Sequence, residues 1–190
     1  MTLQDSRGCK YRKRVTESLP EEYHCRHVER LPLGTGYPDL VRRVGALLET
    51  PQLRDRTRLI VDYTGCGRPV VDMLRDARLE PIAVTITGGD SVTGGPGGLR
   101  VPKRDLVGAA QVLLQSKRLK IAEELEHTPA LVRELLEFRM KIDPVTAHDS
   151  YSAWREGAHD DLVLALAIAC WYGERDKPAP ITPSVSYFSL

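Results

Sequence analysis

Arg58-Leu59-Ile60-Val61-Asp62-Tyr63-Thr64-Gly65-Cys66-Gly67-Arg68-Pro69-Val70-Val71 is the stretch that decides the fold of this chain of 190 residues. Its apolar run, bounded by charge before it and by glycine and proline after it, predicts a central strand buried on both faces. Gly65 and Gly67 allow the chain to reverse into a helix that Pro69 is suited to begin. Ligands of open α/β sheets collect beyond the carboxyl ends of strands, where Asp62 stands. The simpler alternative is that Asp62 caps the following helix.

The composition bounds the class of protein. A chain of 190 residues can form one domain with a real core. Its 27 basic and 26 acidic residues nearly balance, so any nucleic-acid contact must come from a local patch. The 4 cysteines (Cys9, Cys25, Cys66 and Cys170) have no CxxC spacing, which indicates a reduced intracellular protein without structural zinc. No apolar stretch is long enough for a membrane span or a leader, so we expect a soluble, cytoplasmic protein.

Periodicity predicts the other elements and an α/β class. Residues 1–20 are polar and basic, and we expect disorder or a weak edge strand there. Strands are expected within 22–33 and at 81–87 and 119–121, and helices at 40–48, 69–77, 102–115, 130–140 and from 160 onward. Asp39 is the expected N-cap of the first helix. The strand ending at Asp62, helix 69–77 and strand 81–87 form a βαβ unit, whose crossover should be right-handed.

The segment 88–101 contains too many glycines for a core element and is expected to form a long hairpin or a mobile flap. It lacks the GxxxxGK[ST] pattern, which excludes a phosphate-loop motor. Arg100, Lys103 and Arg104 stand beside it and are placed to touch phosphates. The alternative is that they are the solvated start of a helix.

Asp160 and Asp161 open an almost wholly apolar helix. Adjacent residues lie about 100° apart around a helix, so one of the two faces the sheet more squarely. Asp161 shares its side with Ala165 and Ala169, a stripe of small residues suited to close approach against a sheet, whereas Asp160 lines up with Ile168. We therefore favour Asp161 as the functional residue. The alternative is that both acids merely stabilise the helix start through its dipole.

In order and spacing, the chain resembles the nuclease domain of the large terminase subunit of tailed bacteriophages. The resemblance is carried by 59–71, Ile86-Thr87-Gly88-Gly89, Val101-Pro102-Lys103-Arg104-Asp105-Leu106-Val107 and 159–167, with a further likeness at 28–35. It covers about residues 23–173. It implies a ribonuclease H-like fold, with a mixed central sheet flanked by helices. It also implies an endonuclease that cuts double-stranded DNA when genome packaging ends.

The resemblance also implies the site. Asp62, Asp161 and Asp160 would be the catalytic carboxylates that bind Mg²⁺ or Mn²⁺ in a two-metal site, with ions about 3.5 to 4 Å apart. Arg100, Lys103 and Arg104 would contact the DNA. The partners would be double-stranded DNA and other packaging proteins, namely the portal, the small terminase subunit and a separate ATPase. The setting would be the cytoplasm of a bacterial host, with a phage or prophage gene and no membrane.

Two departures from the family affect what the chain can do. The ATPase motor of a large terminase subunit has no counterpart here. The family also places its first metal-binding Asp on a strand upstream of Tyr23, and the chain lacks an identifiable first strand of that kind. We divide the chain into a polar arm (1–22), the nuclease-like domain (23–173) and a proline-rich tail (174–190). The incomplete metal site predicts a weak or inactive nuclease, unless Glu17, Glu21, Glu22 or a partner chain supplies the missing ligand.

Two other functions fit parts of the sequence. The chain could keep the ribonuclease H-like fold as a catalytically inactive DNA-binding or protein-binding module. The loop Val61-Asp62-Tyr63-Thr64-Gly65-Cys66-Gly67 also resembles the first loop of S-adenosylmethionine-dependent methyltransferases. It lacks that family's third glycine, and the next strand ends without an acid. The methyltransferase is therefore the less favoured of the two.

Overall fold

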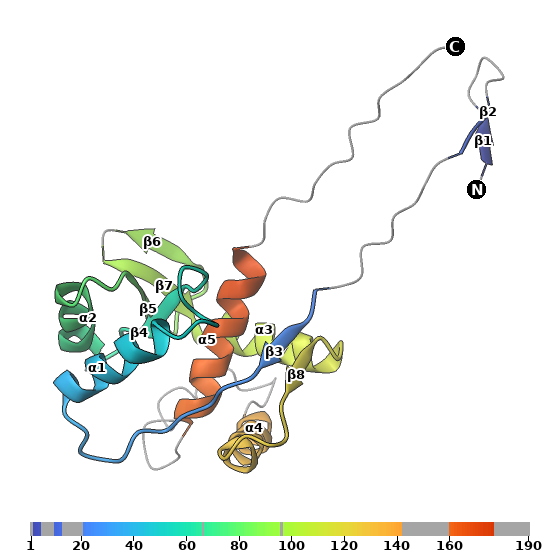
Figure 1. The fold of residues 1–190 in the computed structure, drawn as a ribbon. Coiled ribbons are helices and arrows are strands. Elements are labelled where there is room, and N and C mark those ends of the chain that lie inside the picture. The colour runs from blue at the N-terminus through green and yellow to red at the C-terminus, as the bar shows by residue number, and fades with distance from the viewer. Residues whose placement is uncertain are drawn as a thin grey trace.

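The computed structural model describes residues 2–4, 10–12, 21–65, 67–95, 97–141 and 160–176, with the side chains of 2–4, 10–12 and 137–141 left out. The chain is an α/β protein, as predicted (Figure 1). The loop 142–159, the segment 13–20 and most of the tail lie outside the described residues, as do Cys9 and Cys66.

The main sheet has four strands in the order β4-β5-β7-β6. β4 (Leu59–Asp62), β5 (Pro81–Thr87) and β7 (Gly98–Pro102) are parallel, and β6 (Thr93–Gly95) pairs antiparallel with β7 at one edge. The strand ending at Asp62 and the strand 81–87 are confirmed, and so is the hairpin within 88–101. The parallel pairing of β4 and β5 confirms a βαβ unit, because α2 (Gly67–Asp76) connects them.

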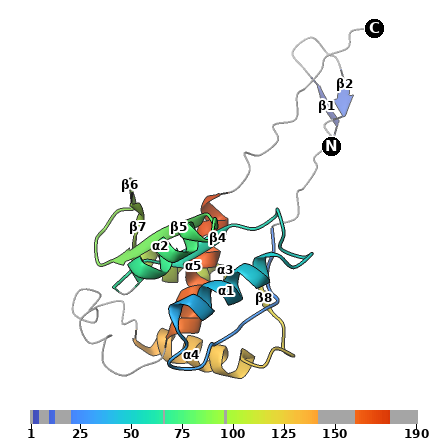
Figure 2. The same cartoon turned by 60° about the vertical axis from the view of Figure 1, so that its left-hand side comes forward.

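A second sheet contains β3 (Tyr23–Cys25) and β8 (Leu119–Ile121), which are parallel. It is separate from the main sheet. The mixed sheet flanked by helices that was expected is thus present as the main sheet, with β3 and β8 outside it. The strand expected within 22–33 is much shorter than that range. Both sheets pack on α5 (Asp161–Arg175), which lies between them in Figures 1 and 2.

The helices cover both faces of the main sheet (Figure 2). α3 (Lys103–Gln115) and α5 bury one face in a core with Val84 and Val101, while α2 packs on the other face with α1 (Tyr37–Leu48) beside it. α4 (Thr128–Lys141) packs on α5 through Leu131. No helix among the described residues has the length and apolar character that crossing a bilayer requires.

Helix α1 begins earlier than predicted. Its N-cap is Gly36, and Asp39 lies in the first turn, where it pairs with Arg42 (2.8 Å). The expected N-cap at Asp39 is wrong because Pro38 is favoured at the first helical positions and starts the helix upstream of it. α5 begins with Asp160 as its N-cap and Asp161 in its first turn, in agreement with the predicted helix start.

Two glycines make the tight turn after β4 possible. Gly65 has a φ of 64°, a conformation that other residues rarely adopt. At Gly67 the requirement is steric, because a Cβ would lie 2.3 Å from the carbonyl oxygen of Asp62. The start of α2 is thus pressed against the end of β4, which holds the backbone of Asp62 in place.

The N-terminal arm contains two short strands, β1 (Thr2–Gln4) and β2 (Lys10–Arg12). They pair antiparallel with each other, with Leu3 opposite Tyr11. They form a sheet of their own and are not an edge of the main sheet, within the part of the chain that is described.

Candidate active site

Asp62 stands at the carboxyl end of β4. Side chains alternate along a strand, so Asp62 shares its face with Ile60, which packs on the core formed with α3 and α5. Its Oδ1 accepts a hydrogen bond from the backbone N–H of Thr64 (2.8 Å), and the Thr64 Oγ1 accepts one from the N–H of Ile86 (2.9 Å). The carboxylate is therefore held by the turn that follows β4, and this turn is tied to β5. The hydrogen bond shown for Asp62 is thus made to the turn that precedes α2.

Lys103 is the first residue of α3 and directly follows the end of β7. Its side chain is half-buried, and burial lowers its pKa to about 8. The carboxylates of Asp160 and Asp62 oppose that shift by attracting the ammonium group. One lysine thus lies within electrostatic reach of two acids from different elements.

Asp160 precedes α5 and is half-buried, whereas Asp161 is exposed. Burial raises the pKa of the Asp160 carboxyl, Lys103 lowers it, and the charges of Asp161 and Glu134 raise it. Lys103 therefore lies within electrostatic reach of both Asp62 and Asp160 at the carboxyl edge of the main sheet. Asp161 lies next to Asp160, with its side chain largely in solvent.

The stripe of small residues on α5 is not packed against the main sheet. Ala165 and Ala169 are exposed and line a groove, while Ile168, in line with Asp160, is buried in the core. The reason for preferring Asp161 is therefore wrong, although no contact here tests which acid binds a metal. Burying the larger apolar side chains of α5 gains more free energy than burying its alanines, and this orients Asp160 inward.

Glu134 of α4 is a site residue that the sequence pattern did not reveal. It is 7% exposed, and its Oε2 accepts hydrogen bonds from the N–H groups of Leu162 (3.1 Å) and Val163 (3.2 Å). Its Oε1 pairs with Nη2 of Arg30 (2.5 Å). Glu134 thus caps the N-terminus of α5 and fixes the helix that carries Asp160. A glutamate in a helix gives no sequence signal for such a long-range role.

The three predicted DNA-binding residues have different surroundings. Lys103 adjoins the carboxylates. Arg104 donates from Nη1 to the Asp90 carboxylate (2.7 Å) and from Nη2 to the Asp90 backbone oxygen (2.7 Å), so it ties the glycine-rich loop to α3. Arg100 is exposed on β7. Arg104 therefore has a partner within the chain.

The acids at the start of β3 are far from the site. The backbone oxygen of Glu21 accepts from Arg118 Nε (2.7 Å), and Arg118 pairs with Glu174 near the end of α5 (2.7 Å). Glu174 is about 20 Å from Asp160 along the helix axis, at about 1.5 Å per residue. Glu21 and its neighbour Glu22 therefore lie away from Asp160. Glu17, the third candidate, lies outside the described residues.

Removing the Lys103 charge should change the titration of Asp160. In Lys103→Gln we expect the pKa of Asp160 to rise further, because the group that lowers it is gone. The titration can be followed by NMR of the carboxyl carbon, with Lys120→Gln on β8 as a matched exposed control. An unchanged pKa would mean that Lys103 and Asp160 do not interact.

The same variant should alter the pH dependence of stability. The pKa of Lys103 is about 8 in the folded chain and near 10.5 when exposed, so the unfolded chain binds the extra proton between these values. The contribution of Lys103 to the free energy of unfolding therefore increases as the pH rises between these two values. Urea unfolding of Lys103→Gln should lack this rise.

Asp62 and Asp160 are the candidate ligands for a metal ion beside Lys103. Among the described residues, no group of three or more His, Cys, Asp or Glu side chains is arranged to hold a metal ion. Asp62 and Asp160 nevertheless offer hard oxygen ligands, and Mg²⁺ is commonly held by one or two carboxylates together with water. Asp62 and Asp160 are therefore the residues that would hold such an ion.

Searches of protein families, curated proteins and solved structures find no significant match to this chain.

Proposed function

We propose that this chain is a divalent-metal-dependent endonuclease that hydrolyses phosphodiester bonds of double-stranded DNA, with a ribonuclease H-like fold. The observation that supports this most is the approach of Asp62 and Asp160 to Lys103 at the carboxyl edge of the main sheet. Ligand sites of open α/β sheets lie at that edge. The ordered motifs that resemble the terminase nuclease domain include all three residues.

The residues suit phosphodiester hydrolysis. Asp62 and Asp160 would hold Mg²⁺ or Mn²⁺, which supplies charge stabilisation on the phosphate and a more acidic bound water. Asp62 is fixed by its hydrogen bond to Thr64, so little reordering is needed when it binds a cation. The Lys103 ammonium can turn from the carboxylates to a phosphate oxygen, adding a second positive charge beside the scissile bond.

A second candidate is the inactive DNA-binding module, and one observation favours it. Lys103 already places a positive charge beside Asp62 and Asp160, which compensates them without a metal ion. A site balanced in this way can bind phosphates and still lack the ligands that cutting needs. Cutting and binding must therefore be measured separately.

Metal dependence is the direct test. We expect nicking of supercoiled plasmid in millimolar Mg²⁺ or Mn²⁺, and none in excess EDTA or with Zn²⁺ alone, because the candidate ligands are hard oxygens. Gel electrophoresis reports the nicked form. Nicking that persists in EDTA would exclude a metal-dependent nuclease. DNA binding without nicking in any metal would instead support the inactive module.

The DNA contacts have their own test. Each lost phosphate contact should flatten the plot of log binding constant against log salt by about one unit of slope. We expect the double variant Arg100→Ala/Lys103→Ala to lower the slope by about two units in fluorescence anisotropy with a duplex. Arg42→Ala on α1, which is exposed, is the matched control. An unchanged slope in the double variant would place the DNA elsewhere.

A further inference from the structure

Among the described strands, β3 pairs only with β8, and residues 26–29 continue from β3 without belonging to a strand. β3 pairs with β8 on one side, and every residue from 23 to 29 lines a groove of about 830 Å³. Successive side chains of an extended chain point in opposite directions. The groove therefore runs beside β3 and beside the residues that follow it. In the described part of the chain, no strand pairs with the other edge of β3.

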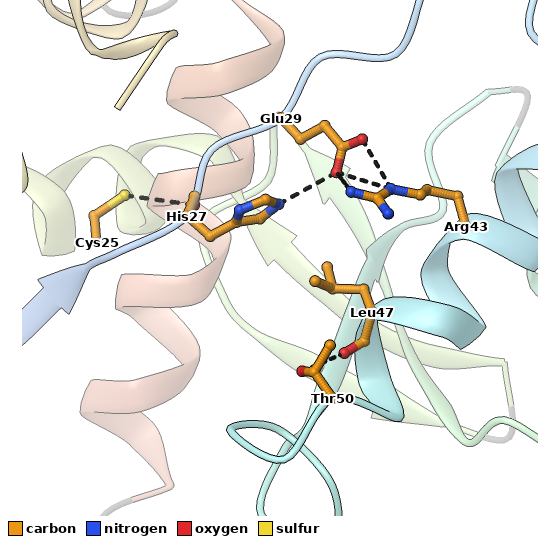
Figure 3. Close-up of polar contacts among 6 residues, drawn as sticks. All are labelled: Cys25, His27, Glu29, Arg43, Leu47 and Thr50. Carbon is orange, nitrogen blue, oxygen red and sulfur yellow. Dashed lines mark hydrogen bonds and ion pairs between the residues drawn. The ribbon is translucent and has the colours of Figure 1, made fainter. Parts of the chain in front are cut away.

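The other walls of the groove come from α5 and from the end of α1 (Figure 3). The α5 wall includes Ala165 and Ala169, which are exposed apolar residues. Across the groove from the segment that carries His27 lies Leu47. Arg43 donates from Nε (2.9 Å) and Nη2 (3.0 Å) to Glu29 and so joins two of the walls. The groove is thus apolar, held at a set width and open beside an unpaired strand edge.

An unpaired edge next to an apolar groove is suited to receive a further strand. Added strands gain main-chain hydrogen bonds from the edge and bury side chains in the adjoining groove. The main sheet has a similar open edge, because β4 pairs with β5 alone among the described strands. Both sheets pack on α5, so a strand on this edge would rest on a helix that already supports them.

The β1–β2 hairpin is the strand source that the chain itself offers. A two-stranded hairpin alone is marginally stable in water, and these strands pair only with each other in the described residues. β2 ends ten residues before β3 begins. A linker of that length can span about 33 Å when extended, and consecutive strands are usually neighbours.

We infer that the β1–β2 hairpin docks in the groove, with β2 beside the open edge of β3 and the residues 26–29 that follow it. The docked state differs from the arrangement in Figure 1, where β1 and β2 form their own sheet. It extends the β3–β8 sheet and covers Ala165 and Ala169. It does not depend on the proposed nuclease function, because no step of it uses Asp62, Lys103 or Asp160.

The test uses hydrogen exchange of the amides of residues 26–29 in the full chain, measured by mass spectrometry. Tyr11→Pro breaks β2, since proline lacks the N–H and fixes φ. Ala169→Arg fills the groove. We expect each variant to speed exchange of these amides about tenfold, and the double variant to exchange no faster than either one. Gln111→Arg, exposed on α3, is the control and should have no effect.

Several results would overturn the proposal. Amides of 26–29 that already exchange at the unprotected rate in the unaltered chain would show that nothing covers the edge. Additive effects of Tyr11→Pro and Ala169→Arg would show that hairpin and groove act independently. Protection that grows with protein concentration, with dimers in sedimentation, would assign the docked strand to a second copy of the chain.

Discussion

Asp160→Asn will reduce plasmid nicking at least about 100-fold, whereas Asp161→Asn will keep most of it. Replacing even an outer partner of a metal ligand costs 10- to 100-fold, so loss of a ligand should cost no less. Asp160 is half-buried within reach of Lys103, but Asp161 is exposed. Asn keeps the volume of Asp and loses its charge. Initial nicking rates in Mg²⁺ measure the difference.

Asp62→Asn should resemble Asp160→Asn, because both carboxylates approach the same lysine. Circular dichroism and thermal unfolding must show that each variant is folded, so that lost nicking reports the site and not the fold. If Asp161→Asn abolishes nicking while Asp160→Asn leaves it intact, the acid chosen from the structure is the wrong one. Loss of nicking in all three variants would mean that both Asp160 and Asp161 are needed for cutting.

Short-range sequence patterns correctly predicted several strands, one hairpin and the start of α5. The apolar run before Asp62, the apolar run at 82–87 and the glycines of 88–101 are local signals, and the structure has strands and a hairpin there. Two acids before an apolar run likewise predicted the start of α5. These features need no knowledge of the distant chain.

The errors concern distant contacts. The sequence pattern could not show that β3 pairs with β8, since that pairing joins residues almost 100 positions apart. Nor could spacing choose between Asp160 and Asp161, because the choice depends on which side of α5 the sheet and α3 bury. On α4 the apolar Leu136 is 58% exposed, whereas the charged Glu134 is buried, and residue type alone would favour the reverse.

Glu134→Ala is expected to destabilise the chain by about 2–4 kcal/mol, because it leaves buried donors without partners. The N–H groups of Leu162 and Val163 would lose their acceptor, and Arg30 would lose its ion pair. Part of the Arg30 cost is relieved by solvent, because its side chain is 36% exposed. Urea unfolding at neutral pH measures the change.

Two further variants distinguish the effect of the hydrogen bonds that Glu134 accepts from the effect of its charge. Glu134→Gln keeps an oxygen for the α5 amides and loses the charge, so its cost should fall between that of Glu134→Ala and that of the unaltered chain. Arg133→Ala, exposed on the same helix, should change stability by less than about 0.5 kcal/mol. If Glu134→Ala costs no more than Arg133→Ala, Glu134 does not hold the start of α5. In that case Asp160 must be positioned by Lys103 and the core contacts of α5 alone.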